Sequence, residues 1–87
     1  MAQVRFTAAA EAQLLRLDRT IAQRLLSKLR WLAENADSVP HERLTGEFEG
    51  ISKLRVGDYR ALYTYSQSDQ AIHVHFVGHR RAVYKPR

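Results

Sequence analysis

Side chains that can bind phosphate groups are concentrated in residues 52–87 of this 87-residue chain. This part contains seven Lys or Arg and only two acids, whereas residues 1–51 contain seven of each kind, so the net charge of +5 belongs to residues 52–87. Such a concentrated basic field favours a polyanionic partner, nucleic acid first, over the solvated surface that scattered charges usually make. The cations are Lys53, Arg55, Arg60, Arg80, Arg81, Lys85 and Arg87.

Three of the four histidines lie in the same part of the chain, at His73, His75 and His79. An imidazole titrates near neutral pH and can therefore give or take a proton in catalysis. His73 and His75, two residues apart, can share a strand face and hold a metal, but no third ligand is apparent, so we predict no metal site. The sequence also has no cysteine, no Gly-rich phosphate loop and no nucleophile elbow.

The hydrophobic pattern predicts one α+β domain over residues 1–87, with a short N-terminal strand and two helices packed on one face of an antiparallel sheet, in the order β-α-α-β-β-β. Apolar residues recur with the spacing of a helix before a polar connector. After the connector they alternate with polar residues, as in a strand. The expected elements are a strand at 4–6, helices at about 7–18 and 20–35, a connector at 35–49, and strands at about 51–56, 59–66 and 71–78.

Gly57 and Asp58 predict a two-residue hairpin turn of type II′, which requires glycine at its first position. This turn pairs Val56 with Tyr59 and Arg55 with Arg60, and it fixes the two faces of the sheet. The face toward the helices should carry Leu54, Val56, Tyr59, Ala61, Tyr63, Tyr65, Ile72, Val74 and Phe76. The other face should carry Lys53, Arg55, Arg60, Leu62, Thr64, His73, His75, Val77 and His79.

Arg55 directly opposite Arg60 is a destabilising arrangement for a purely structural sheet. An anionic ligand between the two guanidinium groups would make it tolerable, and residues 52–87 hold few acids to pair with the cations. We therefore interpret this face as a binding site rather than as the wet side of a two-layer domain.

Two segments resemble a known family. Residues 53–63, KLRVGDYRALY, look like the central hairpin of the RelE/ParE toxin superfamily, and residues 77–85, VGHRRAVYK, resemble the C-terminal segment of its RelE branch. The resemblance implies a RelE-like fold and a toxin that cuts messenger RNA in the ribosomal A site until a RelB-like antitoxin wraps it. It also implies catalytic groups at Lys53, Arg60, Arg80 and Tyr84, with His79 and Arg81 beside them. We expect the further cations Arg55, Arg81 and Lys85 to contact the RNA.

Metal-independent RNA cleavage of this kind uses the ribose 2′-OH as nucleophile and needs no cofactor. Arg60 and Arg80 suit the negative charge that develops on the phosphate oxygens, and Tyr84 can stack on a base. Lys53 supplies charge or a proton. Some relatives have a second lysine where this chain has Ile51, so His79 is expected either to replace that proton carrier or to hold the Arg80 loop.

Two other functions stay open on the sequence alone. A ParE-like toxin would inhibit DNA gyrase by binding, without nuclease chemistry, and a catalytically weakened relative would only bind its antitoxin. No segment approaches the length of a membrane span or has the apolar core of a signal peptide, so we expect a cytoplasmic protein without a membrane partner.

Overall fold

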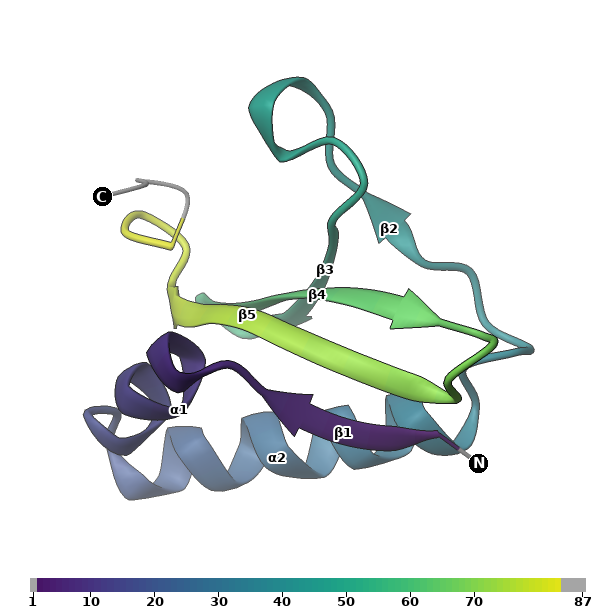
Figure 1. Cartoon of the computed structure of the whole chain (residues 1–87). Coiled ribbons are helices and arrows are strands. Elements are labelled where there is room, and N and C mark those ends of the chain that lie inside the picture. The colour runs from purple at the N-terminus through teal and green to yellow at the C-terminus, as the bar shows by residue number, and fades with distance from the viewer. Residues whose placement is uncertain (1, 84–87) are drawn as a thin grey trace.

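The computed structural model describes residues 2–83 and has two helices on one face of a five-stranded sheet (Figure 1). The α+β prediction is therefore confirmed, and β2 and the short 3-10 helix η1 are additions that the sequence pattern did not indicate. The elements are β1 Gln3–Phe6, α1 Ala8–Leu15, α2 Arg19–Glu34, β2 Glu42–Arg43, η1 Gly46–Phe48, β3 Ser52–Val56, β4 Tyr59–Ser66 and β5 Ala71–His79.

The strand order is β1-β5-β4-β3-β2. β3, β4 and β5 form the expected antiparallel meander and β2 is antiparallel to β3, but β1 runs parallel to β5, so the sheet is mixed rather than antiparallel throughout. Parallel neighbours need a long crossover connection. Here the two helices and the hairpin separate β1 from β5 in the sequence, which allows the first strand to add to the outer edge of the last.

Both helices begin at residues whose side chains cap them. The Thr7 hydroxyl accepts a hydrogen bond from the Ala10 N–H at 3.1 Å, and the Asp18 carboxylate accepts one from the Thr20 N–H at 3.1 Å. Because Asp18 caps α2, it is not the end of α1, which ends at Leu15, three residues earlier than predicted. Within residues 2–83 no helix combines the length and the apolarity needed to cross a membrane.

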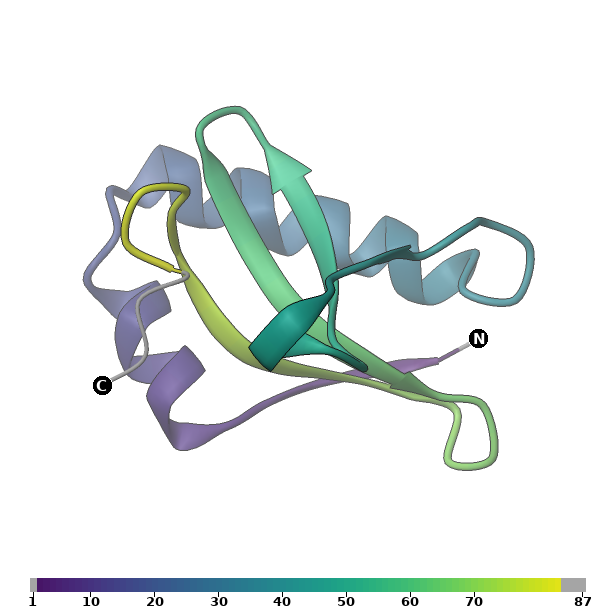
Figure 2. The same cartoon turned by 90° about the horizontal axis from the view of Figure 1, so that it is seen from above.

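The core lies between α2 and the sheet, with α2 crossing beneath the strands (Figure 1). Leu25, Leu29 and Leu32 form the buried stripe of α2, at the spacing of one helix face. They pack in one cluster with Ala61, Tyr63, Ile72 and Val74 of the sheet. The segment containing η1 and the segment after β5 rise on the opposite side of the sheet, so they frame the face that the helices leave uncovered (Figures 1 and 2).

The β3–β4 hairpin has the predicted register, including Arg55 opposite Arg60 and Lys53 opposite Leu62. Gly57 has a φ of +59°, whereas Asp58 does not have a positive φ, as a type II′ turn requires. A side chain at Gly57 would meet no atom within 4 Å, so glycine is needed there for the backbone conformation and not for space.

A β-bulge at His75 makes part of the predicted face assignment for β5 wrong. Leu62 pairs with Phe76 and the next residue, Tyr63, pairs with Val74, so His75 is the extra residue. An extra residue exchanges the two faces beyond it. Val77 consequently enters the core on the helix side of the sheet, and Phe76 lies with Leu62 on the opposite face. His79 pairs with Tyr59 and does not share a face with His73.

Replacement of Gly57 by alanine should lower the free energy of unfolding by about 1–2 kcal/mol, because the turn conformation is strained for any residue with a Cβ. The matched control is Gly78→Ala, since Gly78 has no positive φ and a Cβ there would meet the Val83 Cβ at an ordinary 3.8 Å. Urea denaturation should show a lower midpoint for Gly57→Ala and a nearly unchanged one for Gly78→Ala. Equal midpoints for the two variants would contradict the assigned turn.

Candidate functional site

The face of the sheet away from the helices carries the predicted cationic cluster. Lys53 and Arg55 come from β3 and Arg60 from β4, and the hairpin register places Arg55 and Arg60 directly opposite each other. Leu62 lies on the same face and is fully buried, so this face is not exposed to solvent over its whole area. The structure therefore brings together the three β3–β4 cations that the sequence predicted.

Glu42 of β2 pairs with two of these cations, so the expectation that they lack acidic partners is wrong. β2 runs beside β3 with Glu42 opposite Lys53. One Glu42 carboxylate oxygen lies 3.3 Å from Lys53 Nζ and accepts a hydrogen bond from Arg55 at 2.6 Å. The hydrogen bond from Arg55, with a further contribution from Lys53, lowers the pKa of Glu42 below its usual value of 4.5. The sequence did not predict a role for Glu42, because its ion pairs with Lys53 and Arg55 depend on strand β2, which was not predicted either.

Arg60 is fixed to the backbone of its own hairpin. One guanidinium nitrogen donates to the Gly57 carbonyl and to the Tyr59 carbonyl, each at 2.9 Å. With Arg60 held this way and Arg55 bound to Glu42, the like-charged pair finds its acceptors inside the chain. The opposition of the two arginines therefore does not by itself require an anionic ligand.

Arg80 is tied to the tip of the same hairpin. Its backbone N–H donates to the Asp58 carbonyl at 2.8 Å, and its Nε lies 3.4 Å from the Asp58 carboxylate. The side chain remains half exposed, at 49%. Because Arg60 pairs with Gly78, just before this segment, both arginines start from the turn end of the sheet.

His79 holds the turn that carries Arg80. Its Nδ1 accepts a hydrogen bond from the Arg81 N–H at 3.1 Å, and its carbonyl accepts from the N–H groups of Ala82 and Val83. The ring also contacts Tyr59 edge-on, with 5.4 Å between centroids. When Nδ1 is an acceptor, the proton of the neutral imidazole sits on Nε2. These contacts support the positioning role, and proton transfer by His79 stays a prediction.

Of the three remaining sequence-predicted site residues, Arg81 falls within the described range. Arg81 is exposed in the turn after β5. Tyr84 and Lys85 lie outside the described residues, so their predicted stacking and RNA-binding roles rest on the sequence.

The histidines of β5 do not build a metal site. His75 Nε2 lies 3.0 Å from the Thr64 hydroxyl, and burial, followed by the nearby His73, lowers the pKa of His75. No group of three His, Cys, Asp or Glu side chains within residues 2–83 is arranged to hold a metal ion.

His41 anchors the connector that delivers Glu42, a role without a sequence signal. Its Nε2 lies 2.8 Å from the Ala36 carbonyl, which can only accept, so its Nδ1 is the acceptor of the Tyr63 hydroxyl at 2.6 Å. Burial raises the pKa of Tyr63 to about 12, so this hydroxyl keeps its proton at neutral pH. The Tyr65 ring stacks on His41 from the sheet as a second contact.

Comparison with known proteins assigns the chain to a family. The model of the family described as ParE toxin of type II toxin–antitoxin system, parDE, matches residues 4–84. The chain belongs to this family and thus to the RelE/ParE toxin superfamily, so it is a toxin of a type II toxin–antitoxin system. No curated protein matches the chain.

Solved structures of RelE and ParE toxins share the fold. A chain of the RelBE2 toxin–antitoxin complex from Mycobacterium tuberculosis is 28% identical, with a TM-score of 0.80 over 91% of this chain and 98% of that one. The isolated Escherichia coli RelE toxin is 21% identical, with a TM-score of 0.77 over 91% and 84%. The YoeB/ParE toxin from Agrobacterium tumefaciens is 18% identical, with a TM-score of 0.72 over 88% and 96%. The latter two show the fold alone.

Glu42→Gln should change how stability depends on pH. Because the folded-state pKa of Glu42 is lowered, its ion pairs stabilise the fold above pH 4.5, and this contribution is lost as the pH falls through the folded value. The stability difference between the natural chain and Glu42→Gln should thus be largest near neutral pH and shrink in acid. Urea denaturation across the pH range measures it.

Glu47→Gln is the control for this prediction, since Glu47 lies in η1 and makes no ion pair with any residue in the described range. It removes the same charge and should leave the stability at neutral pH nearly unchanged. A difference for Glu42→Gln that does not vary with pH would show that the ion pairs contribute nothing.

Proposed function

We propose that the chain is a ribosome-dependent endoribonuclease that cuts messenger RNA in the A site. The observation that carries this proposal is that two guanidinium groups are held at the end of one hairpin. Arg60 is bound to the Gly57 carbonyl, and Arg80 is bound to Asp58, the next residue of the turn. Groups fixed in advance stabilise a developing charge without reorganising during the reaction.

In the proposed reaction the ribose 2′-oxygen attacks the adjacent phosphorus. The bond from phosphorus to the 2′-oxygen forms and the bond to the 5′-oxygen breaks, which leaves a 2′,3′-cyclic phosphate and a 5′-hydroxyl. Negative charge develops on the non-bridging oxygens. Arg60 and Arg80 can bind these oxygens through planar N–H pairs that keep their protons at any physiological pH.

The reaction also needs an acceptor for the 2′-hydroxyl proton and a donor for the leaving oxygen. Ile51 stands where some relatives have a second lysine, and Glu42 and Lys53 form an acid–base pair on the same face. Glu42, whose pKa lies below its usual value of 4.5, is ionised at neutral pH and joins His79 as a candidate acceptor. Lys53 is the candidate donor.

Arg55, Arg81 and Lys85 are proposed to bind the RNA backbone, and Tyr84 to stack on a base next to the cleaved bond. No cofactor or metal takes part in this proposal, because the nucleophile and the charged groups come from the RNA and the chain.

An acidic, RelB-like antitoxin is the proposed inhibitor of this activity. Related structures contain a RelE toxin together with a RelB antitoxin, including the intact RelBE complex of Escherichia coli and the archaeal RelE–RelB complex from Pyrococcus horikoshii. An acidic partner over the cationic face would exclude RNA and neutralise the site. Action on ribosomes would place the protein in the cytoplasm.

The second candidate function is inhibition of DNA gyrase by binding. It is favoured by the description of the matching family, which names ParE. The internal pairing of Lys53 and Arg55 with Glu42 is equally consistent with a surface that binds a protein without cleaving RNA. A weakened relative that only binds its antitoxin would share that surface.

Removal of the Arg80 guanidinium should reduce cleavage without unfolding the protein, because its side-chain ion pair with Asp58 is exposed. With purified ribosomes holding a defined message, primer extension should map cuts in the A-site codon. Arg80→Ala should cut about 100- to 1,000-fold more slowly. Arg5→Ala is the control, since Arg5 lies on β1 and its exposed side chain donates a hydrogen bond only to Gln3 among the described residues. An Arg80→Ala variant that cuts at the natural rate would contradict the assigned role.

Arg60→Lys separates charge from geometry. Lysine keeps the positive charge but cannot offer two parallel N–H groups to a phosphate. Cleavage in the same ribosome assay should fall by about tenfold to 100-fold, while circular dichroism should show an unchanged fold. Full activity in this variant would mean that Arg60 contributes only charge.

A further inference from the structure

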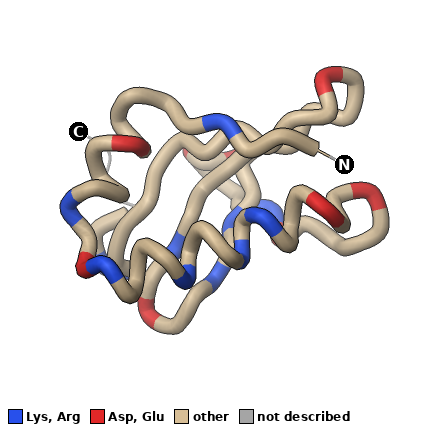
Figure 3. Tube along the Cα trace, turned by 90° about the horizontal axis from the view of Figure 1, so that it is seen from below, with Lys and Arg blue, Asp and Glu red and all other residues tan. Residues whose placement is uncertain are grey.

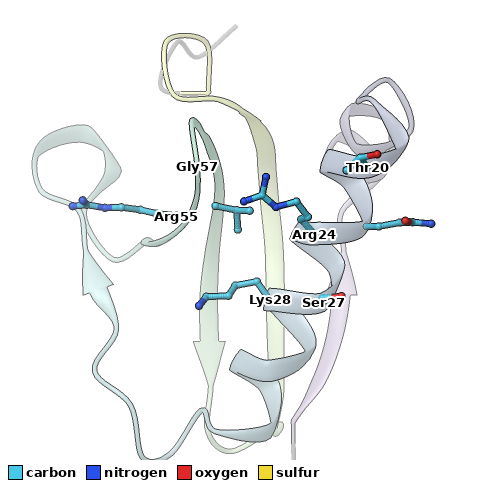
Figure 4. A pocket seen from close by; sticks show the side chains of 8 residues that line it. Thr20, Arg24, Ser27, Lys28, Arg55 and Gly57 are labelled. Carbon is cyan, nitrogen blue, oxygen red and sulfur yellow. The ribbon is translucent and has the colours of Figure 1, made fainter.

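A polar groove lies between α2 and the turn end of β3 (Figure 4). Its volume is about 490 Å³. The α2 wall consists of Thr20, Gln23, Arg24, Ser27 and Lys28, and the opposite wall consists of Arg55, Val56 and Gly57 at the end of β3. Arg60 and Arg80 do not line it.

Arg24 and Lys28 provide the charge of this groove. Both side chains extend from α2 toward the hairpin, whereas Arg55 points away from the helix, toward Glu42 (Figure 4). Within residues 2–83 neither Arg24 nor Lys28 has a carboxylate partner, and Lys28 lies over the Trp31 ring at 5.0 Å. Both side chains are exposed.

The surrounding surface of α2 is also basic. The sequence of α2 holds four Lys or Arg and one acid, Glu34, at its last residue. Seen from the helix side, blue positions follow one another along α2, and red ones lie toward its ends and in the loops (Figure 3). The groove thus lies in a local positive field that an acidic ligand backbone would neutralise.

The residues that line the groove favour a nucleic acid over a protein segment as its ligand. Protein interfaces have an apolar core, whereas nucleic-acid interfaces are polar and strongly positive. Apart from Val56 and the glycine, the groove is lined by polar or charged side chains. A second groove of about 360 Å³, which shares Arg55, is the apolar one, with Trp31, Leu32 and Val39 among its lining residues.

We propose that the α2–β3 groove binds the sugar–phosphate backbone of folded, double-helical RNA. The lining has no aromatic side chain on which an unpaired base can stack, so it suits a backbone rather than a single strand. Arg24 and Lys28 are four residues apart, which is about 6 Å along a helix and fits neighbouring phosphates. Thr20, Gln23 and Ser27 can donate further hydrogen bonds to phosphate or ribose oxygens.

This site goes beyond the proposed cleavage, because it holds an RNA that is not cut. It meets the cationic cluster only at Arg55, and Arg60 and Arg80 lie outside it. The test uses an RNA hairpin with 2′-O-methyl riboses, which has no nucleophile and cannot be cleaved. Binding is measured by fluorescence anisotropy at several salt concentrations, without ribosomes, so the result is independent of cleavage.

The variant is Arg24→Gln with Lys28→Gln, and the control is Arg19→Gln with Arg30→Gln, which removes the same charge from α2 outside the groove. The groove variant should bind the hairpin about tenfold more weakly and lower the salt slope of the affinity by about two. The control should change the affinity by less than about threefold. Circular dichroism shows that both variants are folded.

Three results would overturn the proposal. Equal losses in the two variants would show that affinity follows net charge and not the groove. A groove variant that loses binding of polyglutamate but keeps RNA binding would assign the groove to an acidic protein segment. Tighter groove-dependent binding of a DNA duplex than of the RNA hairpin would assign it to DNA.

Discussion

The two-residue turn at Gly57 and Asp58 is the constraint on which the rest of the site depends. Its left-handed glycine fixes the register of β3 and β4 and so decides which side chains face away from the helices. The turn also supplies the Gly57 carbonyl that holds Arg60, and the carbonyl and carboxylate of Asp58 that hold Arg80. One tight turn therefore sets the fold of the meander and the positions of both guanidinium groups.

Pairing of the cations within the chain has a consequence for how RNA could bind. Lys53 and Arg55 share Glu42, and Arg80 has Asp58, so an incoming phosphate must compete with two carboxylates. The Arg55–Glu42 and Arg80–Asp58 pairs are about half exposed, and exposed pairs contribute little to stability, so these two pairs can be exchanged at small cost. The carboxylates thus keep the cations in place without blocking a ligand that carries several negative charges.

The sequence predicted the features that depend on local signals, and it missed those that depend on contacts between distant residues. The turn residues specify the hairpin register, and the apolar period specifies α2. The bulge at His75 could not be read from alternation, because an extra residue leaves no mark on a short strand. Glu42 was hidden in a polar connector. The net charge of residues 1–51 gave no sign of a basic surface on α2, because acids elsewhere in that part of the chain cancel the charge of its four cations.

The account is tested most directly by inducing the chain in bacterial cells and mapping both RNA ends and gyrase–DNA complexes in the same culture. It predicts growth arrest with discrete cuts in translated messages, no cuts in untranslated RNA, and no trapped gyrase. Arrest with intact messages and gyrase trapped on DNA would contradict it, and would make the cationic face a protein-binding surface rather than a nuclease site.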